Sequence, residues 1–274
     1  MNNYLKIKKL INEADAIIIG AGAGLSTSAG INYDSKDFEN KFPELVEKYG
    51  MTDMYTSSFY DFETEEQRWS YWSKHIDYLY NINPKDVYLK LLNIVKNKNY
   101  FVITTNVDGQ FLKSGFNSQK VFEVQGTLSK MQCCVGCHDK LYNNLELVKK
   151  MIKYRNDTKI PTSLIPYCPI CGKSMEINLR KDAFFVEDDN WRLLSTNYEM
   201  FINNNKDKKL VLIELGAGFN TPGIIRFPFE QLTYNLSNTT LIRVNDKYAD
   251  VPFEIKDKSI SLNEDCNSFI DNLI

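Results

Sequence analysis

The sequence lacks an excess of either charge sign. Its 33 lysines and arginines nearly balance its 35 aspartates and glutamates, so the net charge at pH 7 is -2. A protein that grips the backbone of a nucleic acid needs a clustered positive excess. We therefore expect no nucleic acid among the partners of this chain.

Long apolar runs are also missing, although 43% of the residues are hydrophobic. No stretch approaches the roughly 18 to 20 apolar residues that a membrane-spanning helix needs. The first 20 residues, MNNYLKIKKLINEADAIIIG, lack the apolar core of a signal peptide. These absences predict a cytoplasmic chain that does not interact with a membrane.

Cysteine is scarce but clustered. The chain has six cysteines, and without a secretory signal they favour a metal site over disulfides. Two knuckles are present, formed by Cys133 or Cys134 with Cys137, and by Cys168 with Cys171. Four thiolates close a tetrahedral zinc site with no open position, so the predicted zinc is structural. His138 as a ligand, or a set of unrelated buried cysteines, are the alternatives.

A helix-like segment, LELVKKMIKY, separates the knuckles, and we expect residues 131–179 to form an inserted zinc-binding module.

The rest of the sequence has the pattern of an α/β protein. Short apolar, β-branched runs alternate with segments of helical spacing, which favours a doubly wound, Rossmann-like parallel sheet. The expected strands are residues 15–19, 101–104, 121–124, 210–215 and 241–244. The expected helices are residues 3–13, 64–79, 85–97 and 191–205, and a last helix that begins near residue 264. Residues 177–191 are expected to return the chain to this sheet.

These elements lead to a domain assignment. We expect a nucleotide-binding domain formed by residues 1–30, 84–130 and 180–274. Residues 31–83 are aromatic and acidic and show no strand pattern. They are expected to form a helical lid over the nucleotide crevice, with most of their aromatic rings packed in a core.

A glycine-rich turn follows the first expected strand. Residues 20–30, GAGAGLSTSAG, include Gly22, Ala23, Gly24 and Ser26 and open a helix of small residues. Glycines at such a turn let backbone N–H groups approach a pyrophosphate at a helix N-terminus. The spacing is not that of a dehydrogenase fingerprint, and no acidic residue closes a second strand about 20 residues later. The turn predicts nucleotide binding, with a tight structural turn as the alternative.

Polar residues follow the next two expected strands. Asn106 and Asp108 come after residues 101–104, and Gln125 comes after residues 121–124. The carboxyl ends of parallel strands line the ligand crevice, so these three side chains are expected to converge there. In the alternative interpretation, Asn106 and Asp108 cap the next helix and Gln125 lies in an ordinary turn.

The later strands end in the same way, in small or polar residues. The residues concerned are Gly216, Gly218, Asn220, Asn245, Asp265 and Cys266. A dinucleotide crevice requires such residues at several strand ends of one sheet. The repetition favours the nucleotide interpretation for the whole sheet.

Taken in order, these motifs resemble the sirtuin family over essentially the whole chain. The matches are Gly22-Ala23-Gly24-Leu25-Ser26 on its GAGxS loop, Thr105-Asn106-Val107-Asp108 on TxNxD, Gln125-Gly126 on HG, Gly216 and Gly218 on the GTS turn, Asn245 on the ribose-contacting asparagine, and Asp265-Cys266 on the adenine-side loop. The resemblance implies the sirtuin fold, a structural zinc and NAD as co-substrate. The NAD contacts that it implies are Gly22, Ala23, Gly24, Ser26, Thr105, Asn106, Asp108, Gln125, Gly216, Gly218, Asn220, Asn245, Asp265 and Cys266.

The departures from the family are as informative as the matches. Sirtuin deacylases use the histidine of HG as a base on the nicotinamide ribose, whereas Gln125 cannot titrate. The family's PDFR motif has lost its arginine at residues 32–35, and its FGE motif is replaced by Val186-Glu187-Asp188. The only two histidines, His75 and His138, lie in the predicted lid and in the first knuckle. These departures argue against deacylation.

The resemblance implies that cleavage of the nicotinamide–ribose bond is retained. Asp108 would bind the carboxamide, and Asn106 would hold the water or ribose that steadies the developing oxocarbenium ion. Gln125 would orient these groups without taking a proton. A nucleophile from another protein then captures the ADP-ribosyl group.

Gln125, the Cys133-x3-Cys137-His138 spacing and NLR-x-D before FVED resemble the macrodomain-linked (class M) sirtuins of microbes. These are protein ADP-ribosyltransferases that act on lipoyl-carrier proteins related to the glycine-cleavage H protein. The resemblance implies a lipoylated carrier as substrate and a macrodomain ADP-ribosyl hydrolase as partner. It also implies Cys133 rather than Cys134 as the first zinc ligand, and Arg180 as a contact to substrate or NAD. A surface salt bridge is the alternative for Arg180. The alternative functions of the chain are a deacylase, a non-catalytic NAD or ADP-ribose sensor, and an NAD glycohydrolase.

Overall fold

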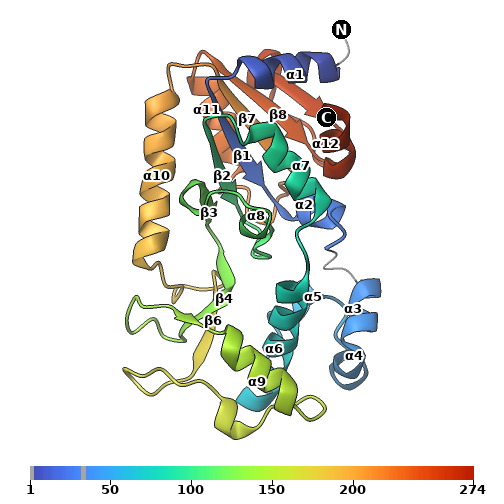
Figure 1. Cartoon of the computed structure of the whole chain (residues 1–274), viewed down its shortest axis with the longest axis vertical. Helices are drawn as coiled ribbons and strands as arrows, with labels where there is room; N and C mark the ends of the chain where they lie inside the picture. Colours follow the sequence, from blue (N-terminus) through green and yellow to red (C-terminus); the bar gives the residue numbers. More distant parts are fainter. Residues whose placement is uncertain (1–2, 32–34) are drawn as a thin grey trace. The chain divides into compact units, whose positions relative to one another are not determined.

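The computed structural model describes residues 3–31 and 35–274. The chain folds into two compact units, whose helices and strands are labelled in Figure 1. The first unit consists of Met1–Gly30, Asn83–Gln125 and Asp189–Ile274, and the second of Ile31–Ile82 and Gly126–Asp188. Residues 126–130 and 180–188 thus lie in the second unit. The departure from the PDFR motif falls on residues 32–35, of which residues 32–34 lie outside the described residues.

The first unit is built around a six-stranded parallel sheet. Its strands are β1 (Ala16–Ala21), β2 (Tyr100–Thr104), β3 (Val121–Glu123), β7 (Leu210–Leu215), β8 (Thr239–Val244) and β9 (Ser259–Leu262). They lie in the order β3-β2-β1-β7-β8-β9, and every neighbouring pair is parallel. This order reverses its direction between β1 and β7, and parallel sheets bind their ligands at such a point.

Helices cover both faces of this sheet. They are α1 (Asn3–Glu13), α2 (Ala23–Ser28), α7 (Asp86–Val95), α8 (Gln110–Lys113), α10 (Asp189–Asn205), α11 (Arg226–Asn235) and α12 (Cys266–Leu273), with the 3-10 helices η1 (Ser118–Lys120) and η3 (Phe253–Lys258). Ile17 and Ile19 of β1 pack into one core with α1, α7 and α12, whereas Ile18 packs into a second core with α10 and α11. Strands covered on both faces need apolar residues at successive positions, which explains the AIIIGA sequence of β1. The predicted doubly wound parallel sheet is confirmed.

One strand of the parallel sheet was not expected from the sequence. β9 is four residues long, pairs with β8 at the edge of the sheet and has the sequence SISL. Only Ile260 of this strand is buried. A short edge strand with alternating serines lacks the apolar run by which the central strands were recognised.

The second unit contains the expected helices. They are α3 (Ser35–Lys41), α4 (Pro43–Tyr49), α5 (Met54–Ser57), α6 (Glu65–Asn81) and α9 (Leu145–Tyr154), with the 3-10 helix η2 (Thr162–Leu164). Thr64 and Gln67 form a reciprocal capping box that fixes the start of α6. Trp69 and Tyr71 of this helix are fully buried, so an aromatic core is present, whereas Tyr55, Phe59, Tyr60 and Tyr80 are exposed and do not belong to it. The role of these helices as a lid stays a prediction.

A small antiparallel sheet completes the second unit. Its strands are β4 (Gly126–Cys133), β5 (Tyr142–Asn143) and β6 (Met175–Leu179), in the order β5-β4-β6. The expectation that residues 177–191 return to the main sheet is therefore wrong. β6 follows the second cysteine knuckle and pairs with β4, which precedes the first, because the two knuckles lie side by side. The predicted helix at residues 191–205 is confirmed as α10.

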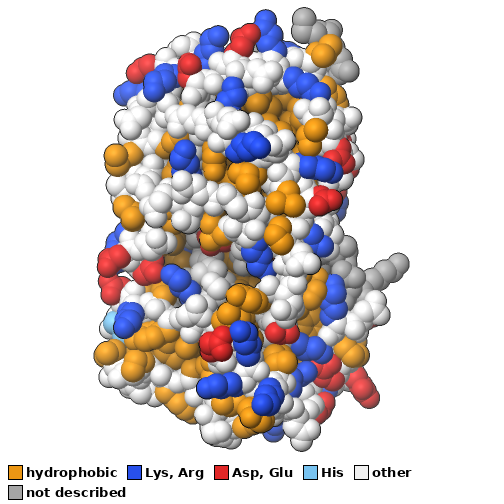
Figure 2. Space-filling view, viewed as in Figure 1, with side chains coloured by type: hydrophobic (Ala, Val, Ile, Leu, Met, Phe, Trp, Pro, Cys, Tyr) orange, Lys and Arg blue, Asp and Glu red, His pale blue; other side chains and the backbone are white. Residues whose placement is uncertain are grey.

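The surface carries both signs of charge. Lysine, arginine, aspartate and glutamate side chains are interspersed over the face shown in Figure 2, in keeping with the net charge of -2. Within residues 3–31 and 35–274, no helix combines the length and the apolar character needed to cross a bilayer.

Candidate active site

Two glycine turns meet where the sheet order reverses. The Gly22 N–H donates to the Leu215 carbonyl at 2.9 Å, and the Gly24 N–H donates to the Gly216 carbonyl at 3.0 Å. A side-chain carbon at Gly24 would lie 2.7 Å from the Gly216 Cα, and one at Gly216 would lie 2.5 Å from the Gly24 Cα. Gly216 also has a φ of 61°, which favours glycine. The turns after β1 and β7 therefore pack backbone against backbone.

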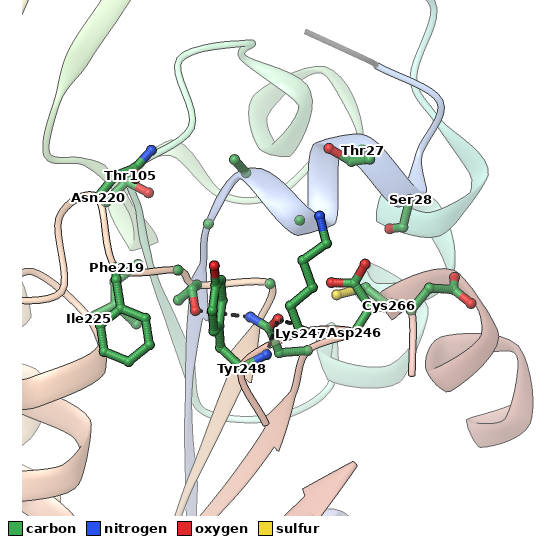
Figure 3. A pocket seen from close by; sticks show the side chains of 18 of the residues that line it. Thr27, Ser28, Thr105, Phe219, Asn220, Ile225, Asp246, Lys247, Tyr248 and Cys266 are labelled. Carbon is green, nitrogen blue, oxygen red and sulfur yellow. Dashed lines mark hydrogen bonds between the residues drawn. The ribbon is translucent and has the colours of Figure 1, made fainter. Parts of the chain in front are cut away.

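A cavity of about 440 Å³ opens over these turns. Figure 3 shows Thr27 and Ser28 of α2 on one side of it, and Phe219, Lys247 and Tyr248 on the other. Its volume lies in the range of ligand sites, roughly 300 to 1,000 Å³. Residues 22–24 and 216–218 carry no side chain larger than a methyl group, so a ligand can approach their backbone closely at the start of α2, which suits the pyrophosphate of a dinucleotide. The cavity thus fits NAD in size and in chemistry.

The structure brings most of the predicted NAD-contacting residues to this cavity. Those that line it are Gly22, Ala23, Gly24, Thr105, Gly216, Gly218, Asn220, Asn245, Asp265 and Cys266. The predicted residues outside its lining are Ser26, Asn106, Asp108 and Gln125. The first set surrounds the two glycine turns, and the second belongs to α2 and to the loops after β2 and β3.

Ser26, Asn106 and Asp108 form one buried group beside the first glycine turn. The Asn106 side-chain amide donates to the Gly22 carbonyl at 3.0 Å, and the Ser26 hydroxyl donates to one Asp108 oxygen at 2.5 Å. The other Asp108 oxygen accepts from the Gln110 N–H, the first N–H of α8, at 2.9 Å. Burial raises the pKa of Asp108 above its ordinary value, although both hydrogen bonds act in the opposite direction. The carboxyl is held rigidly at the carboxyl edge of the sheet.

Gln125 follows β3 and is half-buried. The preceding residue is fixed on both sides, because the Val124 N–H donates to the Thr104 carbonyl and the Trp191 indole donates to the Val124 carbonyl. Within the described part of the chain, the Gln125 side-chain oxygen accepts no hydrogen bond. A side chain that orients a ligand needs an acceptor of this kind, which no described protein donor occupies.

Asn245, Asp265 and Cys266 have structural roles at the cavity. The Asn245 amide donates to the Ala217 carbonyl at 3.0 Å, and its oxygen accepts from the Lys247 and Tyr248 N–H groups. Asp265 caps α12 through the N–H groups of residues 267 and 268. Burial raises the pKa of Cys266 to about 12, so this thiol is unreactive. Contacts of these residues to NAD stay predictions.

Several cavity residues were not predicted. They are Thr27, Ser28, Ala217, Phe219, Thr221, Ile225, Asp246, Lys247, Tyr248 and Glu264. All except Ile225 lie within three positions of a predicted residue. The only sequence signal was therefore their place after a strand end.

Four sulfur atoms of the second unit cluster as predicted. The Sγ atoms of Cys133, Cys137, Cys168 and Cys171 all lie within 4.8 Å of one another. Cys133 and Cys171 are 3.5 Å apart, and Cys137 and Cys168 are 3.6 Å apart. Zn–S bonds of about 2.3 Å in a tetrahedron place the sulfurs roughly 3.8 Å apart, so the cluster fits zinc. His138 lies beside the cluster, 3.4 Å from the Cys168 sulfur, and Cys134 is not a member among the described residues.

Arg180 lies on the loop after β6 in the second unit. Its guanidinium pairs with Glu187 at 2.6 Å and lies over the Phe185 ring at 4.2 Å. This is the ion pair that the alternative interpretation described. A contact to substrate or NAD stays a prediction.

A doubly wound sheet with paired glycine turns at its switch point defines a dinucleotide-binding α/β protein. The comparison with protein families is more specific, because the Sir2 family matches residues 22–214. This chain belongs to the Sir2, or sirtuin, family, as its motifs indicated. A solved complex of a mutant Sir2 homologue with ADP-ribose has the same fold, with a TM-score of 0.61 at 15% identity over 98% of this chain and 94% of that one.

Two curated relatives are more similar in sequence. A Staphylococcus aureus protein named "Protein ADP-ribosyltransferase" is 35% identical over 266 residues, which is 96% of this chain and 84% of that protein. A Fusarium oxysporum protein named "Probable bifunctional ADP-ribose hydrolase/ADP-ribosyltransferase" is 32% identical over 93% of this chain. The alignment spans 44% of the Fusarium protein, so that relative is the longer of the two chains.

Proposed function

We propose that this chain is an NAD-dependent protein ADP-ribosyltransferase of the sirtuin family. The residue at position 125 carries the proposal, because a glutamine stands there where sirtuin deacylases have a catalytic histidine. The similarity to the Staphylococcus aureus protein named as an ADP-ribosyltransferase supports it over nearly the full length.

Neither histidine of the chain offers itself as a replacement base. His75 and His138 both belong to the second unit. Burial lowers the pKa of His75 to about 3, so this imidazole stays neutral at physiological pH and does not bind a proton. His138 lies beside the cysteine cluster, where it contacts the Cys168 sulfur. The chemistry therefore falls to amide and carboxyl groups.

When bound, NAD supplies an ADP-ribosyl group with nicotinamide as its leaving group. In this proposal Asp108, held by Ser26 and the Gln110 N–H, binds the nicotinamide carboxamide. Asn106, anchored on the Gly22 carbonyl, holds a ribose hydroxyl or a water close to the reacting carbon. Fixed polar groups of this kind stabilise developing positive charge without a proton transfer. The Gln125 side-chain oxygen, which accepts no hydrogen bond from the described residues, orients the nicotinamide ribose.

The acceptor that we propose is a lipoylated carrier protein related to the glycine-cleavage H protein. This follows from the resemblance to class M sirtuins, and Arg180 is our candidate for a contact to the substrate or NAD. The joined hydrolase and transferase activities in the name of the Fusarium relative support a macrodomain hydrolase as a functional partner. The cysteine cluster would hold the structural zinc that shapes the second unit.

The test is the intact mass of a lipoylated H-like carrier after incubation with the purified protein and NAD. A mass increase of one ADP-ribose is expected, and it should be lost with Asn106→Ala. An unlipoylated carrier serves as the control for the proposed recognition of the lipoyl group. An unchanged carrier mass, with nicotinamide released into solution, would instead indicate an NAD glycohydrolase.

A deacylase is the second candidate, because solved Sir2 proteins share the fold. Gln125→His separates the two functions. In a deacylase, restoring the base should raise deacetylation of an acetyl-lysine peptide by a factor of about 100 or more. In a transferase, the same change should leave modification of the carrier within about twofold of the wild type.

A further inference from the structure

Two aromatic side chains stand partly exposed in the wall of the NAD cavity. Phe219 is 52% exposed and Tyr248 is 45% exposed, and both line the cavity. Their rings meet edge to face, with centroids 5.2 Å apart and planes at 89°. Figure 3 shows the two rings next to each other on the side opposite α2. Apolar surface in a polar cavity is stabilised when a ligand covers it.

A single buried arginine contacts both aromatic residues. Arg226 begins α11, is 5% exposed and places its guanidinium 4.5 Å from the centre of the Phe219 ring. The same guanidinium donates to the Tyr248 carbonyl at 2.8 Å and to the Asp250 carbonyl at 2.8 Å. The planar guanidinium fixes the loop that carries Tyr248 while it stacks on Phe219.

Arg226 is itself held in a cluster of buried charges. Its Nη1 lies 3.6 Å from the carboxylate of Glu214, a fully buried residue of β7. Arg243 of β8 donates to Glu214 and to Glu230, each at 2.8 Å, and also to the Asp250 carbonyl. Two arginines and two glutamates balance each other, so the guanidinium of Arg226 is neutralised without solvent. The sheet thereby sets the position of Arg226, and Arg226 sets the position of the aromatic pair.

We propose that Phe219 and Tyr248 form an aromatic wall that binds the ADP-ribose part of NAD, and that Arg226 is the positioning residue for this wall. Phe219 directly follows Gly218, and Tyr248 comes three residues after Asn245, so the wall belongs to the loops assigned to phosphate and ribose. Aromatic rings pack on the apolar faces of sugars and bases.

Calorimetric titration with ADP-ribose tests the wall. Phe219→Ala and Tyr248→Ala are each expected to weaken ADP-ribose binding about tenfold, since each removes one ring from the ligand contact. Phe227→Ala is the matched control, because Phe227 is 44% exposed on α11 but does not line this cavity. Binding within twofold of the wild type in both wall variants would overturn the proposal.

Arg226→Lys tests the positioning role. Lysine keeps the charge opposite Glu214 but cannot donate to two carbonyls from a planar group. We expect about fivefold weaker ADP-ribose binding in the wild-type background, and no further loss in the Phe219→Ala/Tyr248→Ala background. A loss of the same factor in both backgrounds would show that Arg226 acts on the cavity independently of the wall. Arg226→Gln is the second variant, and thermal unfolding checks that each is folded.

The aromatic wall rests on NAD as the ligand, as the proposed function does. The experiments nevertheless distinguish failure of the wall from failure of the proposed function. ADP-ribose binding is measured without an acceptor protein. Normal binding with no transfer to a carrier contradicts only the proposed function. Transfer by the wild type, with ADP-ribose affinity unchanged in the wall variants, contradicts only the wall.

Discussion

The two sites of this chain are built in different ways. The cysteine cluster of the second unit consists of side chains, with four sulfur atoms within 4.8 Å of one another. The cavity of the first unit is built on backbone, where Gly24 and Gly216 leave no room for a side-chain carbon. A site made of side chains depends on which residues are present, whereas a site made of backbone depends on which side chains are absent. Substitutions should therefore damage the two sites for opposite reasons.

The largest effect is expected from adding one methyl group to the backbone site. In Gly216→Ala the new carbon would overlap the Gly24 backbone at 2.5 Å, and alanine disfavours the φ of 61°. We expect a loss of about 3 kcal/mol or more in the free energy of unfolding, together with loss of ADP-ribose binding. Urea unfolding and calorimetry measure the two effects.

Gly218→Ala is the matched control for this prediction. Among the described residues, a side-chain carbon at Gly218 meets no atom within 4 Å. Its unfolding free energy should stay within about 0.5 kcal/mol of the wild type. Equal destabilisation by both alanines would show that close packing of the turns is not what requires glycine.

Removing a thiol should damage the second site. Cys168→Ser is expected to abolish zinc binding and to lower the unfolding free energy by about 3 kcal/mol, because the other three ligands lose their shared ion. Zinc content by mass spectrometry, and urea unfolding, measure the result. Cys134→Ser should retain zinc, since Cys134 lies outside the cluster. Zinc loss in Cys134→Ser with retention in Cys168→Ser would contradict the ligand assignment.

A smaller effect on stability is expected from Asp108, whose side chain lies beside the first glycine turn of the cavity. Its pKa is raised by burial, so the folded state binds a proton more tightly than the unfolded state. Stability should therefore fall as pH rises from the unfolded pKa through the folded pKa, and then level off. Asp108→Asn should remove this slope and gain about 1 kcal/mol at pH 7, while losing NAD turnover.

Urea unfolding of wild type and Asp108→Asn between pH 2.5 and 7.5 measures this difference. The stabilities of the two proteins should converge below the unfolded pKa of 3.8, where Asp108 is protonated in both states. A constant difference across the whole range would show that the burial of Asp108 does not control the titration.

The sequence predicted the side-chain site more completely than the backbone site. Cysteine spacing identifies four ligands directly, and only the choice between Cys133 and Cys134 required the resemblance. At the cavity, the glycines and the polar strand ends were found because they follow apolar runs. The distinct role of each residue was not predicted. Only the structure shows that the Asn106 side chain hydrogen-bonds to the Gly22 backbone, whereas the Asn245 side chain hydrogen-bonds to the backbone of Ala217 and Tyr248.

The misses have physical reasons. β6 pairs with β4 of the small sheet because the knuckles bring the two strands together, and local pattern cannot show which sheet a strand joins. Glu214 and Arg243 look like breaks in apolar strands, yet they neutralise each other across neighbouring strands. Phe219 and Arg226 are seven positions apart, and only the structure shows that the guanidinium lies over the ring, 4.5 Å from its centre.

The most direct test of the account is a competition in one reaction mixture. Purified protein is incubated with NAD, a lipoylated H-like carrier and an acetyl-lysine peptide, and the intact masses of both acceptors are followed over time. We expect the carrier to gain one ADP-ribose while the peptide keeps its acetyl group. Loss of the acetyl group from the peptide, with the carrier unchanged, would contradict it and would show that a sirtuin with Gln125 still deacetylates.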